Sequence, residues 1–262
     1  MPITHLLLDI EGTTCPVSFV AEVLFPYARE RLQDFLAEHA AEPEVAALVS
    51  ATQARWQADT TPAACTLLQR SRVTATGGGM EPPDTAARQA ALAVVPYLQW
   101  LIDHDVKDTA LKDLQGRIWA SGYASGSIVA PVFNDAAAAL KRWHAQGLIL
   151  AVYSSGSVPA QQLLYRHTQA GDLSTLFNHW FDTRSGAKQA VSSYQAICSA
   201  MGCQPEAVLF ISDSVAELRA AQQAGLSVLF SDRDGNPGRD SGPFERISDY
   251  SRLTISHGTH GP

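Results

Sequence analysis

The chain has 262 residues, of which 46% are hydrophobic and 17% are charged, and its formal net charge is −7 at pH 7. These values exclude a disordered chain, which combines low hydrophobicity with a large excess of charge. No run of Lys and Arg residues marks a surface for nucleic acid, so we expect no nucleic-acid partner. The length allows one large domain or two smaller ones.

The N-terminal sequence MPITHLLLDIEGTT has a short apolar run that is interrupted at Asp9 and Glu11. A signal peptide carries basic residues before a longer apolar run, so this pattern predicts a strand. No apolar stretch reaches the roughly 18 residues that a membrane-spanning helix needs. The cysteines are too few and too scattered for a disulfide framework, which favours free thiols and a cytoplasmic protein. They are Cys15, Cys65, Cys198 and Cys203.

The first part of the chain is predicted to contain one strand followed only by helices. Residues 5–10 form a continuous apolar run that is typical of a strand buried on both faces. Apolar residues then recur at helical spacing over 17–40, where Pro26 should kink or divide the helix. Further helices are expected over 43–58, 61–71, 84–105 and 108–121, with a loop at 74–84 and Asp84 as an N-cap.

The rest of the chain alternates between helices and strands. Strands are expected over 148–154, 207–213 and 226–232, with a short extended segment at 179–183. Helices are expected over 134–146, 158–170, 188–201 and 214–224. This alternation is typical of βαβ units in a parallel sheet. The tail from about Gly235 is rich in Gly, Pro and polar residues, so we expect it to be loosely ordered, with His257 and His260 exposed.

The strand at 5–10 is too isolated to fold alone, so it should return to pair with the later strands. We therefore predict an α/β fold with a Rossmann-like core and a parallel sheet, built from residues 1–16 and 127–262. Residues 17–126 would form a helical cap domain inserted after the first strand.

Polar residues follow three of the predicted strands. The carboxyl ends of parallel strands meet at one edge of a sheet, and α/β proteins bind ligands there. Lys188 follows a glycine-containing turn after the segment 179–183 and can reach the same edge. Each residue alone is more typical of a turn or a solvated surface, and it is their order along the chain that points to a site. The strand-end residues are Asp9 and Glu11, Ser154 and Ser155, and Asp213.

These residue types suit the transfer of a phosphoryl group. Asp9 and Asp213 supply the oxygen ligands that Mg²⁺ prefers, and a carboxylate such as Asp9 can act as a nucleophile. Lys188 would neutralise charge, and Ser154 would donate a hydrogen bond to a phosphate oxygen. Glu11 could give a proton to the leaving oxygen and later take one from water. The amides around Gly12 and Thr13 could cradle the phosphate.

The order of these motifs resembles the haloacid dehalogenase-like (HAD) superfamily of phosphotransferases. LLLDIEGTT resembles its first motif, with Asp9 as the nucleophile, and VYSSG resembles the second, with Ser154. Lys188 resembles the third, and LFISDSVAE the fourth, with Asp213 and, one helical turn later, Glu217. The helical insert after the first motif resembles the cap that the superfamily carries at that position.

A narrower resemblance is to the enolase-phosphatase family of methionine salvage. It rests on Glu11 in place of the usual aspartate, and on DTALKDLQGRIWASGY, YSSGSVPAQQLL and HWFDTRSGAK. This resemblance implies a monomeric enzyme that holds one Mg²⁺ through Asp9, Asp213 and the main-chain carbonyl of Glu11. It implies enolisation of 2,3-diketo-5-methylthiopentyl-1-phosphate and then dephosphorylation to the acireductone 1,2-dihydroxy-3-keto-5-methylthiopentene. Ser154, Ser155 and Lys188 would bind the substrate.

Several alternatives stay open at this point. Another phosphatase of the superfamily would share the core motifs and differ in its cap, where Lys107, Lys112, Gln115 and Arg117 are equally well explained as substrate contacts or as solvated helix faces. A haloacid dehalogenase would use Asp9 without Mg²⁺, and Glu11 with Asp213 disfavours it. A phospho-accepting receiver module is about half this size and orders its acids differently. No G-x-G-x-x-G follows the first strand, so a dinucleotide-binding enzyme lacks support.

Overall fold

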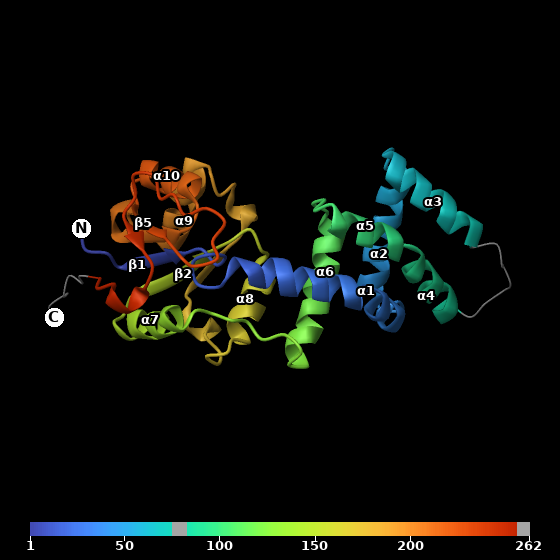
Figure 1. Ribbon diagram of the computed structural model, residues 1–262, viewed down its shortest axis with the longest axis horizontal. Coiled ribbons are helices and arrows are strands. Elements are labelled where there is room, and N and C mark those ends of the chain that lie inside the picture. Colours follow the sequence, from blue (N-terminus) through green and yellow to red (C-terminus); the bar gives the residue numbers. More distant parts are fainter. Residues whose placement is uncertain (75–82, 256–262) are drawn as a thin grey trace. The chain divides into compact units, whose positions relative to one another are not determined.

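The computed structural model describes residues 1–74 and 83–255, without the side chains of 72–74, 83 and 84. The chain forms two compact units, each described here by itself (Figure 1). One unit combines Met1–Ala21 with the chain from Gly126 onward, and the other is Glu22–Ser125. None of the helices in the described part of the chain has both the length and the apolar character needed to cross a membrane.

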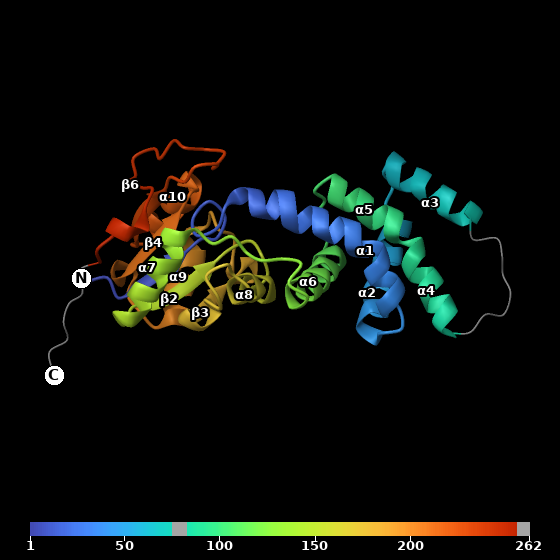
Figure 2. The ribbon, with the colours of Figure 1, turned by 60° about the horizontal axis from the view of Figure 1, so that its bottom comes forward.

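The first unit is built on a six-stranded parallel sheet in the order β3-β2-β1-β4-β5-β6. β1 is central and pairs with both β2 and β4, which confirms that the first strand returns to the later ones. β3 and β6 lie at opposite edges (Figure 2). The strands are β1 His5–Leu8, β2 Ile149–Tyr153, β3 His179–Phe181, β4 Val208–Ser212, β5 Ser227–Ser231 and β6 Arg246–Ile247. The sequence analysis missed β6, which has only two residues.

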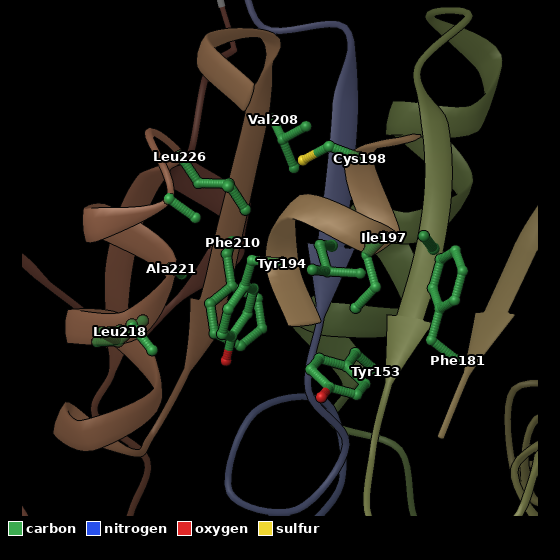
Figure 3. Close-up of a cluster of buried hydrophobic side chains, with 14 of the residues drawn as sticks. Tyr153, Phe181, Tyr194, Ile197, Cys198, Val208, Phe210, Leu218, Ala221 and Leu226 are labelled. Carbon is green, nitrogen blue, oxygen red and sulfur yellow. The ribbon is translucent and has the colours of Figure 1, made fainter. Parts of the chain in front are cut away.

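Helices cover both faces of this sheet, and the strands are apolar on both sides for that reason. Helices α9 (Val191–Met201) and α10 (Val215–Gln223) lie on one face, and α7 (Asn134–Ala145) and α8 (Val158–Arg166) on the other (Figure 1). Figure 3 shows Tyr194 from α9 beside Phe210 and Tyr153 of the sheet, with ring centroids 5.3 and 5.7 Å apart. The α/β architecture that the sequence predicts is therefore confirmed.

The second unit is helical and has its own apolar core. Its helices are α1 Phe25–His39, α2 Pro43–Ala58, α3 Pro62–Thr74, α4 Pro83–Ala93, α5 Val95–Asp103 and α6 Thr109–Ala124. The expected helix 17–40 is helical without a gap from residue 17 to His39, with a π-helix, Phe19–Leu24, that leads directly into α1, where Pro26 lies in the first turn. The expected helix 84–105 is divided into α4 and α5, because Pro96 lies in the first turn of α5. The side chain of Asp84 lies outside the described residues, as does most of the expected loop at 74–84.

The C-terminal segment corrects another expectation. Up to Ile255 it is packed against the core instead of being loosely ordered from Gly235 onward, with Phe244, Tyr250 and Ile255 buried. It contains β6 and a 3-10 turn, Tyr250–Arg252. The Gly- and Pro-rich composition concealed these widely spaced apolar anchors, which have no helical or strand periodicity. His257 and His260 lie outside the described residues.

Candidate active site

Asp9 lies directly after β1 and is almost fully buried. Its main-chain amide extends the sheet by donating to the carbonyl of Ile211, at 3.0 Å. Its side-chain Oδ1 accepts a hydrogen bond from the amide of Ile10 at 2.8 Å. The carboxylate is thus fixed at the carboxyl edge of the sheet, where the sequence predicted a nucleophile.

Lys188 reaches this edge from the loop between β3 and α9. Its Nζ lies 2.8 Å from Asp9 Oδ1 and 2.9 Å from Glu217 Oε2. Tyr194 holds the lysine backbone by donating its hydroxyl proton to the Lys188 carbonyl at 2.6 Å. Burial by itself would lower the pKa of Lys188, but the two carboxylates outweigh it and raise the pKa. The ammonium group therefore stays charged beside Asp9.

Ser212 and Glu217 complete a closed ring of contacts with Asp9 and Lys188. The hydroxyl Oγ of Ser212 lies 3.1 Å from Asp9 Oδ2 and 3.1 Å from Glu217 Oε2. Burial first, and then the charge of Asp9, raise the pKa of Glu217 to about 7. The sequence analysis noted Glu217 one helical turn after Asp213 but gave it no role. It missed Ser212 altogether, and its only signal was a polar residue at the end of an apolar strand.

Glu11 and Asp213 are two further acids close enough to Asp9 to interact with one another, and they form the acidic side of the site. Gly12 adopts a left-handed backbone conformation with φ of 66°, and its Cα is packed so tightly that a Cβ there would collide with the Asp213 carboxylate. Burial, followed by the charge of Asp9, raises the pKa of Asp213 to about 7, and Glu11 adds to this rise. The charge of Glu11 also raises the pKa of Cys15, although burial is the larger cause. The side chains of Asp9, Glu11 and Asp213 therefore interact electrostatically at this edge of the sheet.

The serines after β2 differ from each other. Ser154 is buried on the strand next to β1, and its Oγ accepts the amide of Gly156 at 3.3 Å. Ser155 is exposed. Gln161 from α8 steadies this loop by donating to the carbonyls of Gly156 and Phe181, at 2.8 and 2.9 Å. The sequence analysis did not single out Gln161, because a glutamine in a first helical turn is unremarkable.

The expected phosphate cradle at Gly12 and Thr13 is wrong in its choice of amides. The amide of Gly12 donates to the carbonyl of Cys15 at 2.8 Å, and the amide of Thr13 donates to Ile10 at 3.2 Å. Both groups are used to close the turn. The tight left-handed geometry at Gly12 makes these internal bonds possible.

The candidate cap residues all belong to the second unit. Lys107 pairs with Asp105 at 2.6 Å and Arg117 with Glu44 at 3.0 Å. Gln115 is buried, whereas Lys112 is exposed. The two ion pairs fit the interpretation of these residues as surface charges of this unit, Lys107 in the loop before α6 and Arg117 on α6.

The acidic side of the site suits a divalent cation. No group of three or more His, Cys, Asp and Glu side chains in the described part of the chain has the geometry of a metal site. Mg²⁺ does not require one, because it takes one or two carboxylates and completes its octahedron with water and phosphate oxygens. Burial is the first cause of the raised pKa of Asp213, and repulsion from Asp9 and Glu11 adds to it, so a cation at this edge would meet carboxylate oxygens that few other charges neutralise. The residues present therefore fit this ion.

Comparisons with known proteins agree on the family. The family model of haloacid dehalogenase-like hydrolases matches residues 3–225. The enolase-phosphatase E1 of Synechococcus elongatus is 48% identical over 251 residues, covering 96% of this chain and 98% of that protein. That of Prochlorococcus marinus is 47% identical over 254 residues, with coverage of 96% and 98%. The solved structure of UTR4 protein from Saccharomyces cerevisiae has 33% identity, a TM-score of 0.67 and coverage of 96% and 100%.

Proposed function

The chain belongs to the enolase-phosphatase E1 family of haloacid dehalogenase-like hydrolases, and we propose that its substrate is 2,3-diketo-5-methylthiopentyl-1-phosphate. The enzyme enolises this diketone and then removes its phosphate, giving the acireductone 1,2-dihydroxy-3-keto-5-methylthiopentene in methionine salvage. The observation that carries the proposal is the fixed carboxylate of Asp9, bound by Lys188 at 2.8 Å, with Glu11 two residues later and Asp213 against the same turn.

Asp9 acts as the nucleophile for phosphate release. A carboxylate oxygen of Asp9 attacks the phosphorus, the bond from phosphorus to the ester oxygen breaks, and its electron pair stays on the leaving oxygen. Glu11 gives that oxygen a proton. Water then attacks the aspartyl-phosphate while Glu11 takes up a proton from it, which regenerates Asp9 and frees inorganic phosphate. Lys188 orients the attacking carboxylate through its contact with Asp9, and its own position is fixed by a second contact, with Glu217.

The remaining roles follow from the same edge of the sheet. Ser154, Ser155 and Lys188 bind the phosphate group. Asp9, Asp213 and the main-chain carbonyl of Glu11 would hold one Mg²⁺ per subunit, which stabilises negative charge on the phosphate and on the enediolate. The helical unit Glu22–Ser125 serves as the cap domain and the other unit as the core, a division that their separate compactness supports.

We further place the enzyme in the cytoplasm as a monomer. All four cysteines are free thiols, and two of them are buried, which suits a reducing compartment. Sedimentation equilibrium tests the monomer: a mass that doubles at micromolar concentration contradicts it.

A coupled assay tests the proposed function. The purified protein is given the diketo phosphate with Mg²⁺ or with EDTA, and enol absorbance and released phosphate are followed in the same sample. We expect enol absorbance and released phosphate to increase with Mg²⁺, and neither of them to keep increasing with EDTA. Release of phosphate from simple esters, with no reaction of the diketo phosphate, would reject this substrate and leave another phosphate ester in its place. Phosphate release from neither substrate would reject the phosphatase reaction itself.

A further inference from the structure

The turn that follows Asp9 is held from outside by residues near the end of the chain. The carbonyl of Gly12 accepts two hydrogen bonds, from Ser231 Oγ at 2.9 Å and from Asn236 Nδ2 at 3.0 Å. The carbonyl of Thr13 accepts a third, from the hydroxyl of Tyr250 at 3.0 Å. All three donors are buried. They come from the end of β5 and from the segment that follows it, outside the four motifs that carry the chemistry.

We propose that Asn236, assisted by Ser231 and Tyr250, is a positioning residue for phosphoryl transfer, because it fixes the turn that holds Glu11 beside Asp9 and Asp213. The inference rests on the proposed function only in giving Glu11 its acid–base role and its metal-binding carbonyl. It assigns no contact with substrate to Asn236, which acts through the main chain.

Both the nitrogen and the oxygen of the Asn236 side-chain amide lie against the turn. Its Nδ2 uses its two protons on two carbonyls, those of Gly12 at 3.0 Å and Ser231 at 3.2 Å. Its Oδ1 and the Asp213 carboxylate both crowd the position that a Cβ of Gly12 would occupy. Asn236 therefore holds the peptide that joins Gly12 to Thr13, and together with Asp213 it confines the Cα of Gly12, which directly follows Glu11. Loss of the amide would leave the Gly12 carbonyl with the Ser231 bond alone and would loosen the turn, and with it the carbonyl and side chain of Glu11.

A buried arginine anchors the segment that carries these donors. Arg233 pairs with Asp135 at 2.8 Å and donates to the carbonyl of Ser248 at 2.7 Å. Its guanidinium lies 4.7 Å from the ring centre of Phe133 and 4.1 Å from that of Tyr250. Asp135 also accepts the amide of Tyr250 at 2.8 Å. Buried charges are costly unless they are paired. Nη1 of Arg233 makes both polar contacts, whereas its buried Nε and Nη2 have no hydrogen-bond partner among the described residues, so the ion pair and the two rings compensate the charge in part and hold the segment against the core.

The first test replaces Asn236 with alanine. Residues that orient a metal-binding or reacting group change activity by about 10–100-fold when removed, and we expect kcat for phosphate release to fall in that range while KM changes little. Isothermal titration of the substrate-free variant with Mg²⁺ alone should show weaker binding, about 10-fold, because the Glu11 carbonyl is no longer held. A kcat and an affinity both within twofold of the wild type would overturn the proposal.

Asp234→Asn is the matched control. Asp234 lies in the same loop, is 99% exposed and pairs only at the surface with Arg239, at 3.0 Å. The control should lose that pair without changing kcat or Mg²⁺ affinity. An equal loss in both variants would mean that the loop matters only for stability, and the proposal would fail. If Asn236→Ala does not fold, Tyr250→Phe serves instead, since it keeps the ring on Arg233 and removes the hydroxyl that donates to Thr13 and contacts Ser231 Oγ at 3.1 Å.

A double-variant cycle tests whether Asn236 acts through Glu11. In a Glu11→Ala background, assayed at saturating Mg²⁺ so that the weaker metal binding does not contribute, the further change Asn236→Ala should cost less than threefold in kcat, because the side chain that it positions is already absent. The full loss in that background would reject the route through Glu11. The same measurements on p-nitrophenyl phosphate separate this inference from the substrate assignment: reaction of this ester alone rejects the diketo phosphate, yet it still reports the effect of Asn236.

Discussion

On one side of Asp9, Lys188 and Ser212 connect its carboxylate to Glu217 in a closed ring with separations of 2.8 to 3.1 Å. The acidic side consists of Asp213 and Glu11, which add negative charge, and the pKa of Asp213 rises to about 7, through burial first and then repulsion from Asp9. The ring holds an ammonium group between two carboxylates. The other side gathers carboxylates around one glycine turn.

The difference shows how one cluster serves two tasks. The ring orients Asp9, which a nucleophile needs before substrate arrives. The carboxylates of the acidic side supply the oxygen ligands that a divalent cation takes. One cluster therefore places a nucleophile next to candidate metal ligands.

The change with the largest expected effect removes the group that both sides share. Asp9→Asn keeps the shape of the side chain but replaces a carboxylate with an amide, which is a poor nucleophile. We expect phosphate release to fall by about 10⁴-fold or more, the usual loss for a covalent nucleophile. Phosphate measured by colorimetry over hours checks this, with the exposed variant Asp34→Asn as control. Substantial turnover by Asp9→Asn would rule out the aspartyl-phosphate.

The next change acts on the acidic side alone. Glu11→Ala removes the proposed acid–base group and leaves its main-chain carbonyl in place. We expect phosphate transfer to slow by about 10²–10⁴-fold while Mg²⁺ binding, measured by calorimetry, is retained. Loss of Mg²⁺ affinity instead would make the side chain of Glu11 a ligand, and the assignment of its carbonyl would be wrong.

Gly12→Ala tests how tightly the acidic side is packed. The new methyl group would collide with Asp213, and the left-handed φ adds backbone strain. We expect the free energy of unfolding to fall by about 1–3 kcal/mol, together with weaker Mg²⁺ binding. Gly147→Ala is the matched control, because Gly147 also has a left-handed φ, of 81°, but a Cβ there meets nothing within 4 Å. An equal loss of stability in the two variants would show that the structure around Gly12 shifts enough to avoid the collision with Asp213.

The smallest effect is on the dependence of stability on pH. The pKa of Asp213 in the folded protein, about 7, lies above its ordinary value of 3.8. The folded state therefore binds more protons than the unfolded state between these values, and this group destabilises the protein as pH rises through the window. Without metal, the change in the free energy of unfolding from pH 4 to pH 8 should be less favourable in the wild type than in Asp213→Asn. The expected difference is on the order of 1 kcal/mol, because the partial exposure of Asp213 reduces the effect.

Chemical denaturation at each pH, in EDTA, measures that difference. Adding Mg²⁺ should raise the stability of the wild type at pH 8 and leave Asp213→Asn almost unchanged. Parallel curves for the two proteins in EDTA would contradict the raised pKa.

The sequence predicted those parts of the molecule that have a local pattern. β1 and β4 are short apolar runs closed by acids, so their pairing and the position of Asp9 and Asp213 at one edge could be expected. Ser212 has no such pattern, since a serine at a strand end looks like any turn residue. Pro96 indicated a helix boundary, but the helical spacing of the apolar residues around it favoured one long helix. The packing of the C-terminal segment was not predicted for another reason. Tyr250 contacts Thr13, which lies 237 residues earlier, and a pattern of neighbouring residues cannot show such a contact.

That separation along the chain also has a consequence in time. Protein synthesis proceeds at about 5–20 residues per second, so the 237 residues between Thr13 and Tyr250 take roughly 10–50 s to translate. The turn after Asp9 is therefore synthesised well before its last hydrogen-bond donor. The nascent protein carries its nucleophile long before it can hold the neighbouring turn in place, and the turn gains its full set of donors only after Tyr250 has been made.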